Sequence, residues 1–322
     1  MKTTLKLTSL LSLATAISMF YGCSKTDQVK PAATTDQTTT LNSTADGKHV
    51  YGLLPASPEE YNSLPKYSAD AFQSKLGVFS TGAPAVYSLA TPAVRDQGQI
   101  GSCTAFCGSE AYEIGYYYKH GAFPAIVSPA FLYYEERVNI LHERITADNG
   151  ANMVNIDQAL TKYGICTEAL MPYPGGDRTT AYKTPPTAAA ISNALGFKIG
   201  SYTLINSGDT AAVKTCLRNN IPVMMGFNVY DNTRTYQYFE ALNTTSYTYN
   251  PLTSTGALAS GVSLLGGHAT PIVGYDDTRK AFLVQNSWSA SWGNHGFYYM
   301  PYTVFMSTKI VPQGGVYYAA VN

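Results

Sequence analysis

Apolar residues recur at helical spacing through the first part of the predicted folded region. A Gly-bearing loop leads into residues 103–120, where the pattern predicts a helix that ends at Gly121. Two further helices are predicted over residues 129–141 and 153–163, and Gly164 marks the end of the second of these. Helices are therefore expected to dominate the folded region up to about residue 165.

Beyond residue 195 the pattern changes to short apolar runs bounded by Gly, Asn or Asp, which is typical of β-strands. The stretch between residues 231 and 262 is rich in Thr, Tyr, Asn and Ser, so we expect a long loop there. A helical first half followed by a β-rich second half indicates an α+β fold with two lobes. The predicted strands cover residues 221–229, 269–275, 281–285 and 297–300.

Residues 1–23 have the pattern of an export signal. Lys2 and Lys6 precede an uncharged apolar run from Leu7 to Phe20, and this run is too short to cross a bilayer, which takes roughly 20 apolar residues. The run leads into Cys23 in the sequence FYGC, which resembles a bacterial lipobox. The resemblance implies an exported protein that is lipidated on Cys23 and anchored to the bacterial outer membrane or cell surface. The alternative is an ordinary secretory signal, which would leave the protein periplasmic or secreted.

Residues 24–83 separate this signal from the predicted folded domain, residues 84–322. Residues 24–48 are rich in Thr, Asp and Ala and contain almost nothing that could pack, which predicts a flexible tether. Residues 49–83 hold several Pro and Tyr and only short apolar runs. They could wrap the surface or act as a short pro-like segment.

Composition and cysteine usage limit the partners. The 322 residues are 45% hydrophobic with a formal net charge of zero, so a sizeable core is possible and nucleic-acid binding is not indicated. No pair of the five cysteines has CxxC or other metal-ligand spacing, and we expect neither a metal nor a cofactor. If Cys23 carries lipid and Cys103 stays a free thiol, an odd number remains, which excludes a full disulfide framework. We expect Cys107, Cys166 and Cys216 to be buried thiols, with a Cys107–Cys166 bridge left open.

One cysteine occupies a position suited to nucleophilic chemistry. Cys103 lies at the predicted N-terminus of a helix, where the helix dipole stabilises a thiolate. A thiol attacks a carbonyl only as thiolate, and a neighbouring imidazolium stabilises that anion further. Cys103 therefore needs a histidine partner.

Among five histidines, His268 is the candidate partner. It opens an apolar strand in the sequence GGHATPIVGYDD, whereas His49, His120, His142 and His295 fit solvated surface positions. The turn at residues 276–280 lies midway between His268 and Asn286, so an antiparallel hairpin would place these two residues roughly opposite each other. The Asn286 amide could then orient the imidazole while its other nitrogen faces the thiol.

Three separated segments resemble the active-site blocks of papain-like cysteine peptidases: QGQIGSCTAF, GGHATPIVGY and QNSWSASWGNHGFYYM. The resemblance covers about residues 84–322 and implies a two-lobe fold, with a helical left lobe, a β-barrel-like right lobe and a cleft between them. It places Cys103 on the nucleophile, His268 on the general base and Asn286 on the residue that orients it.

The same resemblance implies three further roles. Gln97 matches the glutamine of the oxyanion hole, and Trp288 matches the indole that shields the His–Asn hydrogen bond. Gly150 matches the cleft glycine whose backbone holds the substrate chain. The sequence departs from the family pattern at Ile100, which replaces a cysteine that forms a disulfide in many members, and at Ser289, where Gly commonly follows the Trp.

The resemblance implies a monomeric cysteine peptidase that acts on proteins or peptides. Two alternatives remain open. One is an acyl transferase or peptide ligase on the same scaffold, and the other is a catalytically inactive surface lipoprotein that binds peptides in the cleft. The complete set of matching residues favours the peptidase, because a binding protein does not need all of them.

Overall fold

The computed structural model describes residues 42–76, 83–174, 181–242 and 246–321. The helices of this part of the chain are α1 (Pro58–Asn62), α2 (Ala69–Leu76), α3 (Cys103–His120), α4 (Pro129–Tyr134), α5 (Met153–Lys162), α6 (Ala188–Ala194), α7 (Thr210–Arg218) and α8 (Tyr302–Phe305). A π-helical turn (Glu135–Ile140) follows α4, and a short 3₁₀ turn covers Ala181–Lys183. No helix in the described ranges is long and apolar enough to cross a membrane.

The strands form one antiparallel sheet in the order β2-β7-β3-β4-β5-β6, with β1 paired to the end of β4. Within the described residues the outer strands β2 and β6 do not pair with each other, so the sheet is open and is not closed into a barrel. The strands are β1 (Val86–Ser88), β2 (Ile199–Ile205), β3 (Val223–Asn232), β4 (Val262–Asp276), β5 (Ala281–Gln285), β6 (Phe297–Pro301) and β7 (Val316–Val321).

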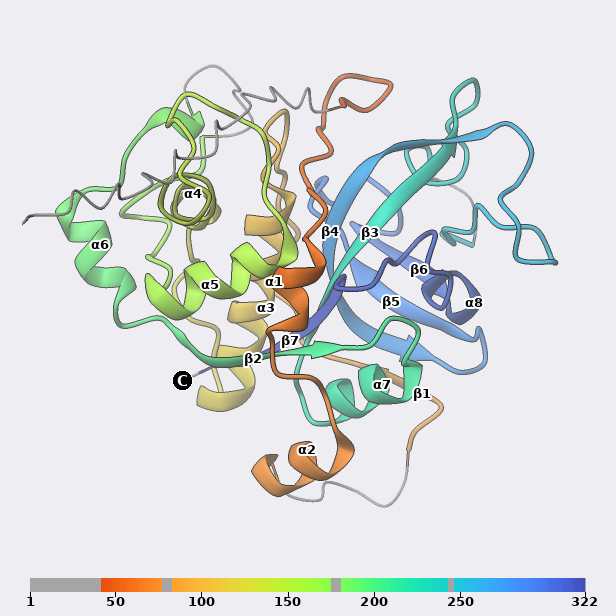
Figure 1. Cartoon of the computed structure of the whole chain (residues 1–322), viewed down its shortest axis with the longest axis horizontal. Helices are drawn as coiled ribbons and strands as arrows, with labels where there is room; N and C mark the ends of the chain where they lie inside the picture. The colour runs from red at the N-terminus through yellow and green to blue at the C-terminus, as the bar shows by residue number, and fades with distance from the viewer. Residues whose placement is uncertain (1–41, 77–82, 175–180, 243–245, 322) are drawn as a thin grey trace, which may run out of the picture. The chain divides into compact units, whose positions relative to one another are not determined.

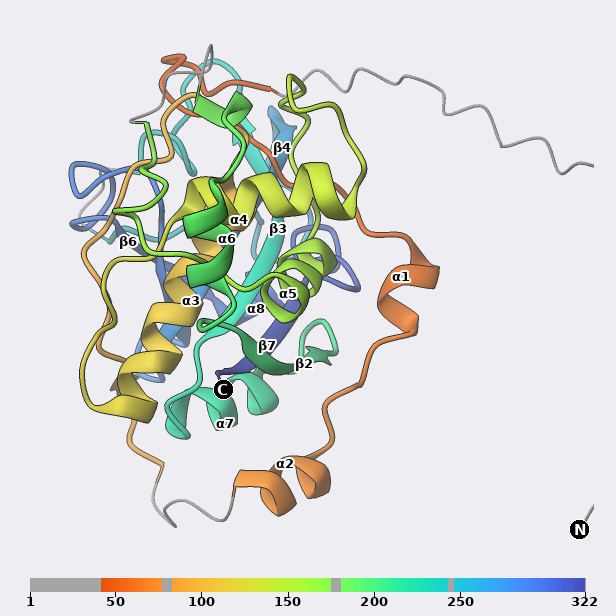
Figure 2. The same cartoon turned by 90° about the vertical axis from the view of Figure 1, so that its left-hand side faces the viewer.

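Helices α3, α4, α5 and α6 lie together on one side of the sheet, and both views show this arrangement (Figures 1 and 2). This arrangement confirms the predicted α+β fold with a helical first half. The predicted helix over residues 103–120 has the bounds of α3, and Gly121 ends it in the left-handed conformation with φ +79°. The predicted long loop is shortened at both ends, because β3 continues to Asn232 and pairs there with Val262 of β4.

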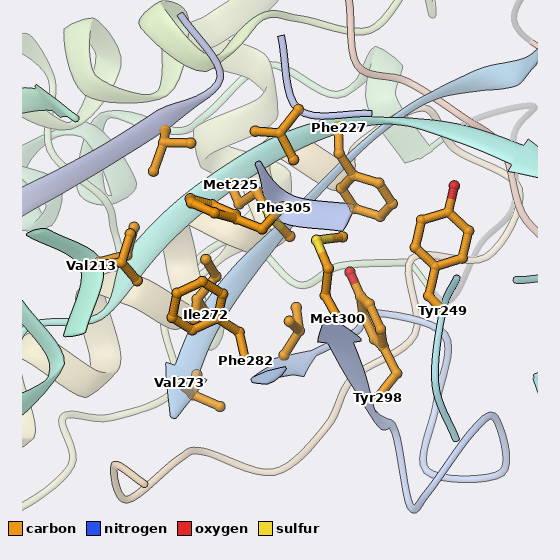
Figure 3. Packing of buried hydrophobic residues seen from close by; sticks show 14 of the residues in the cluster. Val213, Met225, Phe227, Tyr249, Ile272, Val273, Phe282, Tyr298, Met300 and Phe305 are labelled. Carbon is orange, nitrogen blue, oxygen red and sulfur yellow. The ribbon is translucent and has the colours of Figure 1, made fainter. Parts of the chain in front are cut away.

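Two buried hydrophobic clusters correspond to the two halves of the fold. One joins the sheet to α7 and α8, and Figure 3 shows Val213 of α7 and Phe305 of α8 beside Met225 and Phe282 of the sheet. The other lies around α3 and α5 and includes Cys103, Ile156 and Met224. Helix α3 contacts β3, β4 and β7, so it passes along the boundary between the two clusters.

Residues 42–57, before α1, run between the helices and the sheet, in red and orange in Figure 1. Backbone hydrogen bonds join them to both sides. Leu53 N donates to Gly267 O of β4 at 3.0 Å, and Leu54 N donates to Ala151 O, just before α5, at 2.8 Å. We call residues 42–56 the covering segment.

Candidate active site

Cys103 is the first residue of α3, and its side chain is completely buried. Its sulfur receives backbone hydrogen bonds from Gly52 of the covering segment, from Ala269 of β4 and from Thr104. Because Ala269 directly follows His268, the thiol lies next to the predicted general base. The helix N-terminus and the strand thus meet at the position that the sequence predicted.

His268 and Asn286 form the predicted pair. His268 Nε2 lies 2.8 Å from Asn286 Oδ1, and both side chains are fully buried. Since the amide oxygen can only accept, His268 donates from Nε2, which leaves Nδ1 as the basic nitrogen. Nδ1 has no hydrogen-bond partner among the described residues and is therefore available to the thiol.

The hairpin that joins these two residues differs in register from the prediction. The ladder pairs Asp276 with Ala281, shifts by one residue at a bulge, and then pairs Ile272 with Val284. Continued from there, this register would place Asn286 opposite Thr270 and not opposite His268. The side chains meet diagonally, because β5 ends at Gln285 and Asn286 leaves the ladder to donate its N–H to Gly296 O.

Trp288 lies against the imidazole, with 5.1 Å between the two ring centroids, and is 2% exposed. An apolar ring in this position keeps water away from the His268–Asn286 hydrogen bond, which is stronger in such surroundings. Phe227 of β3 and Phe239 also lie within 6 Å of the imidazole ring. The imidazole is therefore held in an aromatic pocket.

Gln97 is completely buried near the start of α3, and hydrogen bonds hold both the oxygen and the nitrogen of its side-chain amide. Its Oε1 accepts from Ser287 Oγ at 2.8 Å, so its Nε2 is the end that donates. Nε2 donates to Val50 O of the covering segment at 2.9 Å and to Ile100 O at 3.1 Å. The amide hydrogen that would serve an oxyanion thus binds a carbonyl of the chain itself.

Gly150 is a point of close backbone approach. Its φ is +84°, and a Cβ at this position would lie 1.9 Å from Gly52 O. The hydrogen bonds to the covering segment are made one residue later: Ala151 N donates to Gly52 O at 3.0 Å, and Ala151 O accepts from Leu54 N. Gly150 therefore provides the space, and Ala151 provides the backbone groups that hold an extended chain.

The covering segment changes two expectations from the sequence. Thr44 and His49 are buried, so packed chain begins before the predicted end of the tether at residue 48. The interpretation of His49 as a solvated histidine is wrong. Its ring stacks on Trp288 at 4.8 Å, and its Nε2 lies 3.1 Å from Asp96 Oδ1. No local pattern marks His49, because both contacts come from residues far along the chain.

The buried environment keeps Cys103 and His268 neutral. Burial raises the pKa of Cys103 to about 12, although hydrogen bonds from Gly52 and Ala269 act in the opposite direction. Burial also lowers the pKa of His268 to about 4, against the hydrogen bond to Asn286, and the neighbouring His49 adds to the lowering. At neutral pH the covered site therefore holds a thiol and a neutral imidazole, which is the less nucleophilic state.

The remaining cysteines are free buried thiols. Cys107, Cys166 and Cys216 make no disulfide, so the bridge left open between Cys107 and Cys166 is not formed. No cluster of three or more potential metal ligands occurs in the parts of the chain that the structure covers. The predicted lipidation site, Cys23, lies outside the described residues.

Comparison with known proteins agrees with this geometry. The family model described as papain family cysteine protease matches residues 86–311. An uncharacterized peptidase C1-like protein of Acanthamoeba polyphaga mimivirus is 30% identical over 217 residues, which are 64% of this chain and 63% of that protein. A cathepsin B-like protein of Giardia intestinalis is 28% identical, over 66% of this chain and 65% of its own. The matches thus span less than two thirds of either relative's length.

Solved structures give the same result for the fold. The crystal structure of xylellain, a cysteine protease from Xylella fastidiosa, has a TM-score of 0.68 and 27% identity, covering 84% of this chain and 95% of that one. A procathepsin B from Trypanosoma congolense, at 18% identity, shares the fold with a TM-score of 0.59. The family model matches most of the chain, residues 86–311, which include Cys103, His268 and Asn286, so this chain belongs to the papain family of cysteine proteases.

Proposed function

We propose that this protein is a cysteine peptidase that hydrolyses peptide bonds through a thioester on Cys103. The observation that carries the proposal is the hydrogen bond from His268 Nε2 to Asn286 Oδ1, which leaves Nδ1 unpartnered while the backbone of the next residue, Ala269, binds the Cys103 sulfur. This is the arrangement of nucleophile, base and orienting residue that thiol acyl transfer requires.

The proposed reaction has two halves. His268 takes the thiol proton, the Cys103 sulfur attacks the substrate carbonyl, and the oxygen acquires negative charge. The Gln97 Nε2–H and the Cys103 backbone N–H would stabilise that charge. When the C–N bond breaks, His268 gives its proton to the leaving amine. Water, deprotonated by His268, then attacks the thioester and releases the acid and the free thiol.

We infer that the covering segment holds the enzyme in a latent state. It fills the place of a substrate: Val50 O accepts from Gln97, and Gly52 N donates to the Cys103 sulfur. It runs in the direction opposite to a substrate. The acyl half of a substrate precedes its scissile bond and would be held at Gly150 and Ala151, whereas here the residues that bond to Ala151, Gly52 and Leu54, follow Val50. This polarity explains how the segment could occupy the site without being cleaved.

We also propose export and lipid anchoring through Cys23. Support comes from Lys2 and Lys6, the apolar run and the Gly-Cys pair at residues 22–23. Two or more acyl chains are needed for stable membrane anchoring, and a lipidated N-terminal cysteine of a bacterial lipoprotein carries them. In this proposal residues 24–83 form the tether and pro-like segment, and residues 84–322 form the peptidase domain, whose substrates are proteins or peptides. Mass spectrometry of the mature N-terminus tests the anchor, and an unmodified start downstream of Cys23 would contradict it.

Labelling with an epoxide or vinyl-sulfone probe tests the peptidase proposal. The covered state should slow both reactions of the parent protein, but the parent should still be labelled on Cys103 and should still hydrolyse a casein-derived peptide mixture. Cys103→Ala should lose both properties, and Cys107→Ala, which changes a buried thiol on the same helix, should retain both. Label on another cysteine, or hydrolysis by Cys103→Ala, would overturn the assignment.

A further inference from the structure

A carboxylate with two hydrogen bonds to the covering segment lies beside the active site. Glu240 Oε1 accepts from Tyr51 Oη at 2.8 Å, and Glu240 Oε2 accepts from Ala45 N at 2.8 Å. Both donors are neutral, and both belong to the segment that must leave before a substrate can bind. Once the segment has left, Glu240 loses both partners and faces the open site.

The backbone of Glu240 is held firmly in place. The Asp231 carboxylate accepts the backbone N–H groups of Tyr238, Phe239 and Glu240 at 2.7 to 3.0 Å, which ties the loop after β3 to the end of that strand. Glu240 O accepts from Trp292 Nε1 at 3.1 Å. The loop therefore does not depend on the covering segment for its position, and the carboxylate stays near the site after the segment leaves.

The Tyr51 ring shows which substrate residue would meet Glu240. Its centroid lies 6.2 Å from that of His268 and 5.8 Å from that of Trp288. His268 must deliver a proton to the leaving amine, so the space beside its ring and Trp288 belongs to the leaving half of the substrate. The Tyr51 side chain reaches from there to Glu240. A substrate side chain in this space is that of the residue directly after the scissile bond.

The local charge favours a donor or a cation in this space. Glu240 is half-buried, and its pKa is raised, first by burial and also by the nearby carboxylates of Asp231 and Asp46, while its hydrogen bonds from Ala45 and Tyr51 act the other way. None of its partners given by the structure is a cation. A partly desolvated carboxylate that loses its donors gains most from a new charged donor and repels a second carboxylate.

We infer that Glu240 is a specificity-determining residue that selects substrates with Lys or Arg directly after the scissile bond, accepts Tyr there less well, and rejects Asp or Glu. This inference rests on the proposed peptidase function. It gives the enzyme a preference on the leaving-group side, set by a residue of the loop between β3 and β4.

Matched fluorogenic peptides that differ only at this position, with Lys, Tyr, Phe or Glu, test the inference. In the parent enzyme, kcat/KM should fall in that order, with Lys above Glu by about tenfold or more, as expected for a hydrogen bond to a charged group. Glu240→Gln keeps the shape and removes the charge, so the ratio of Lys to Glu should fall to within about threefold, with the Phe peptide changing little. Ratios between substrates cancel any difference in the fraction of uncovered enzyme.

The outcomes separate the two proposals. Hydrolysis of all four peptides with equal rates in the parent, or the same Lys-to-Glu ratio in the parent and Glu240→Gln, would overturn the role of Glu240 and leave the peptidase proposal intact. No hydrolysis of any peptide by protein whose Cys103 is labelled by the probe would overturn the peptidase proposal, and the inference with it. If Glu240→Gln does not fold, the ratio of kcat/KM between the Lys and Glu peptides in the parent enzyme alone decides the role of Glu240.

Discussion

The carbonyl oxygen of Val50 accepts a hydrogen bond from Gln97 Nε2 at 2.9 Å, so the donor expected to serve the oxyanion is occupied by the protein's own backbone. The interaction joins residues 47 positions apart and lies in a fully buried site. A substrate carbonyl would have to replace Val50 O before the amide could act on it. The covering segment and the substrate therefore compete for the same donor.

Gly52→Ala should open the site. A Cβ on Gly52 would lie 1.9 Å from Gly101 O, a backbone atom that cannot move aside cheaply, so the covering segment should no longer fit. We expect the rate at which a vinyl-sulfone probe labels Cys103 to rise by about tenfold, since overpacking of this kind costs about 1–3 kcal/mol. Gly196→Ala is the matched control, because its nearest neighbour would be at an ordinary 3.5 Å. Equal labelling of Gly52→Ala and the parent would show that the segment does not limit access.

Gln97→Ala should lower kcat while leaving substrate binding nearly unchanged. Removal of one oxyanion donor costs about 10²–10³ in kcat. The control is Gln99→Ala, an exposed residue of the same loop whose amide contacts Gly47 O of the covering segment. Steady-state kinetics at saturating peptide, corrected for the fraction of titratable Cys103, measure the effect. A kcat equal to that of the parent would remove Gln97 from the mechanism.

Stability should decrease as the pH rises. Burial raises the pKa of Glu110 and of Glu136 to about 8, although Arg95 opposes this shift at Glu110 and a hydrogen bond from Thr104 opposes it at Glu136. Burial also raises the pKa of Asp157 well above its ordinary value. The folded state then binds more protons than the unfolded state above about pH 4.5, so the stabilisation present below that pH is lost as the pH rises toward 8.

Thermal unfolding of the Cys103→Ala protein between pH 5 and pH 8 measures this effect without self-digestion. Tm should fall across the interval. When Glu110→Gln is added, Tm should fall less steeply, because glutamine keeps the shape of the side chain and cannot ionise. Glu59→Gln, at an exposed position, should behave like its parent. A Tm that is constant or rises with pH would mean that the three buried acids do not govern stability.

The site residues that lie in local patterns could be predicted from the sequence. Cys103 follows a Gly-bearing loop and opens a helix, as predicted. His268 was identified from the apolar run that follows it, but the expectation that it opens the strand is wrong, because β4 begins at Val262 and His268 lies within it. The contact between His268 and Asn286 was predicted, but its register was not, because Asp276 pairs with Ala281 and the turn is therefore centred later than residue 277, an offset that the bulge between Ile272 and Gly274 only partly reverses. Apolar alternation fixes neither the centre of a turn nor a bulge of this kind.

The covering segment could not be predicted as an occupant of the site, for a physical reason. Its hold on the cleft comes largely from backbone groups, such as Gly52 N on the Cys103 sulfur and Leu53 N on Gly267 O, and backbone groups leave no mark in composition. The side-chain contact of Tyr51 with Glu240 joins residues 189 positions apart. Neither partner has a neighbouring sequence pattern that points to the other.

The central claim is that Cys103 carries the acyl group during hydrolysis. Acid-quenched mixtures of the enzyme with an activated peptide ester, analysed by intact mass spectrometry and peptide mapping, test it most directly. The account predicts a mass increase equal to the acyl group, located on Cys103, formed faster in Gly52→Ala and absent from Cys103→Ala. Turnover of the same ester by Cys103→Ala at the parent's rate, with no adduct on any cysteine, would contradict it.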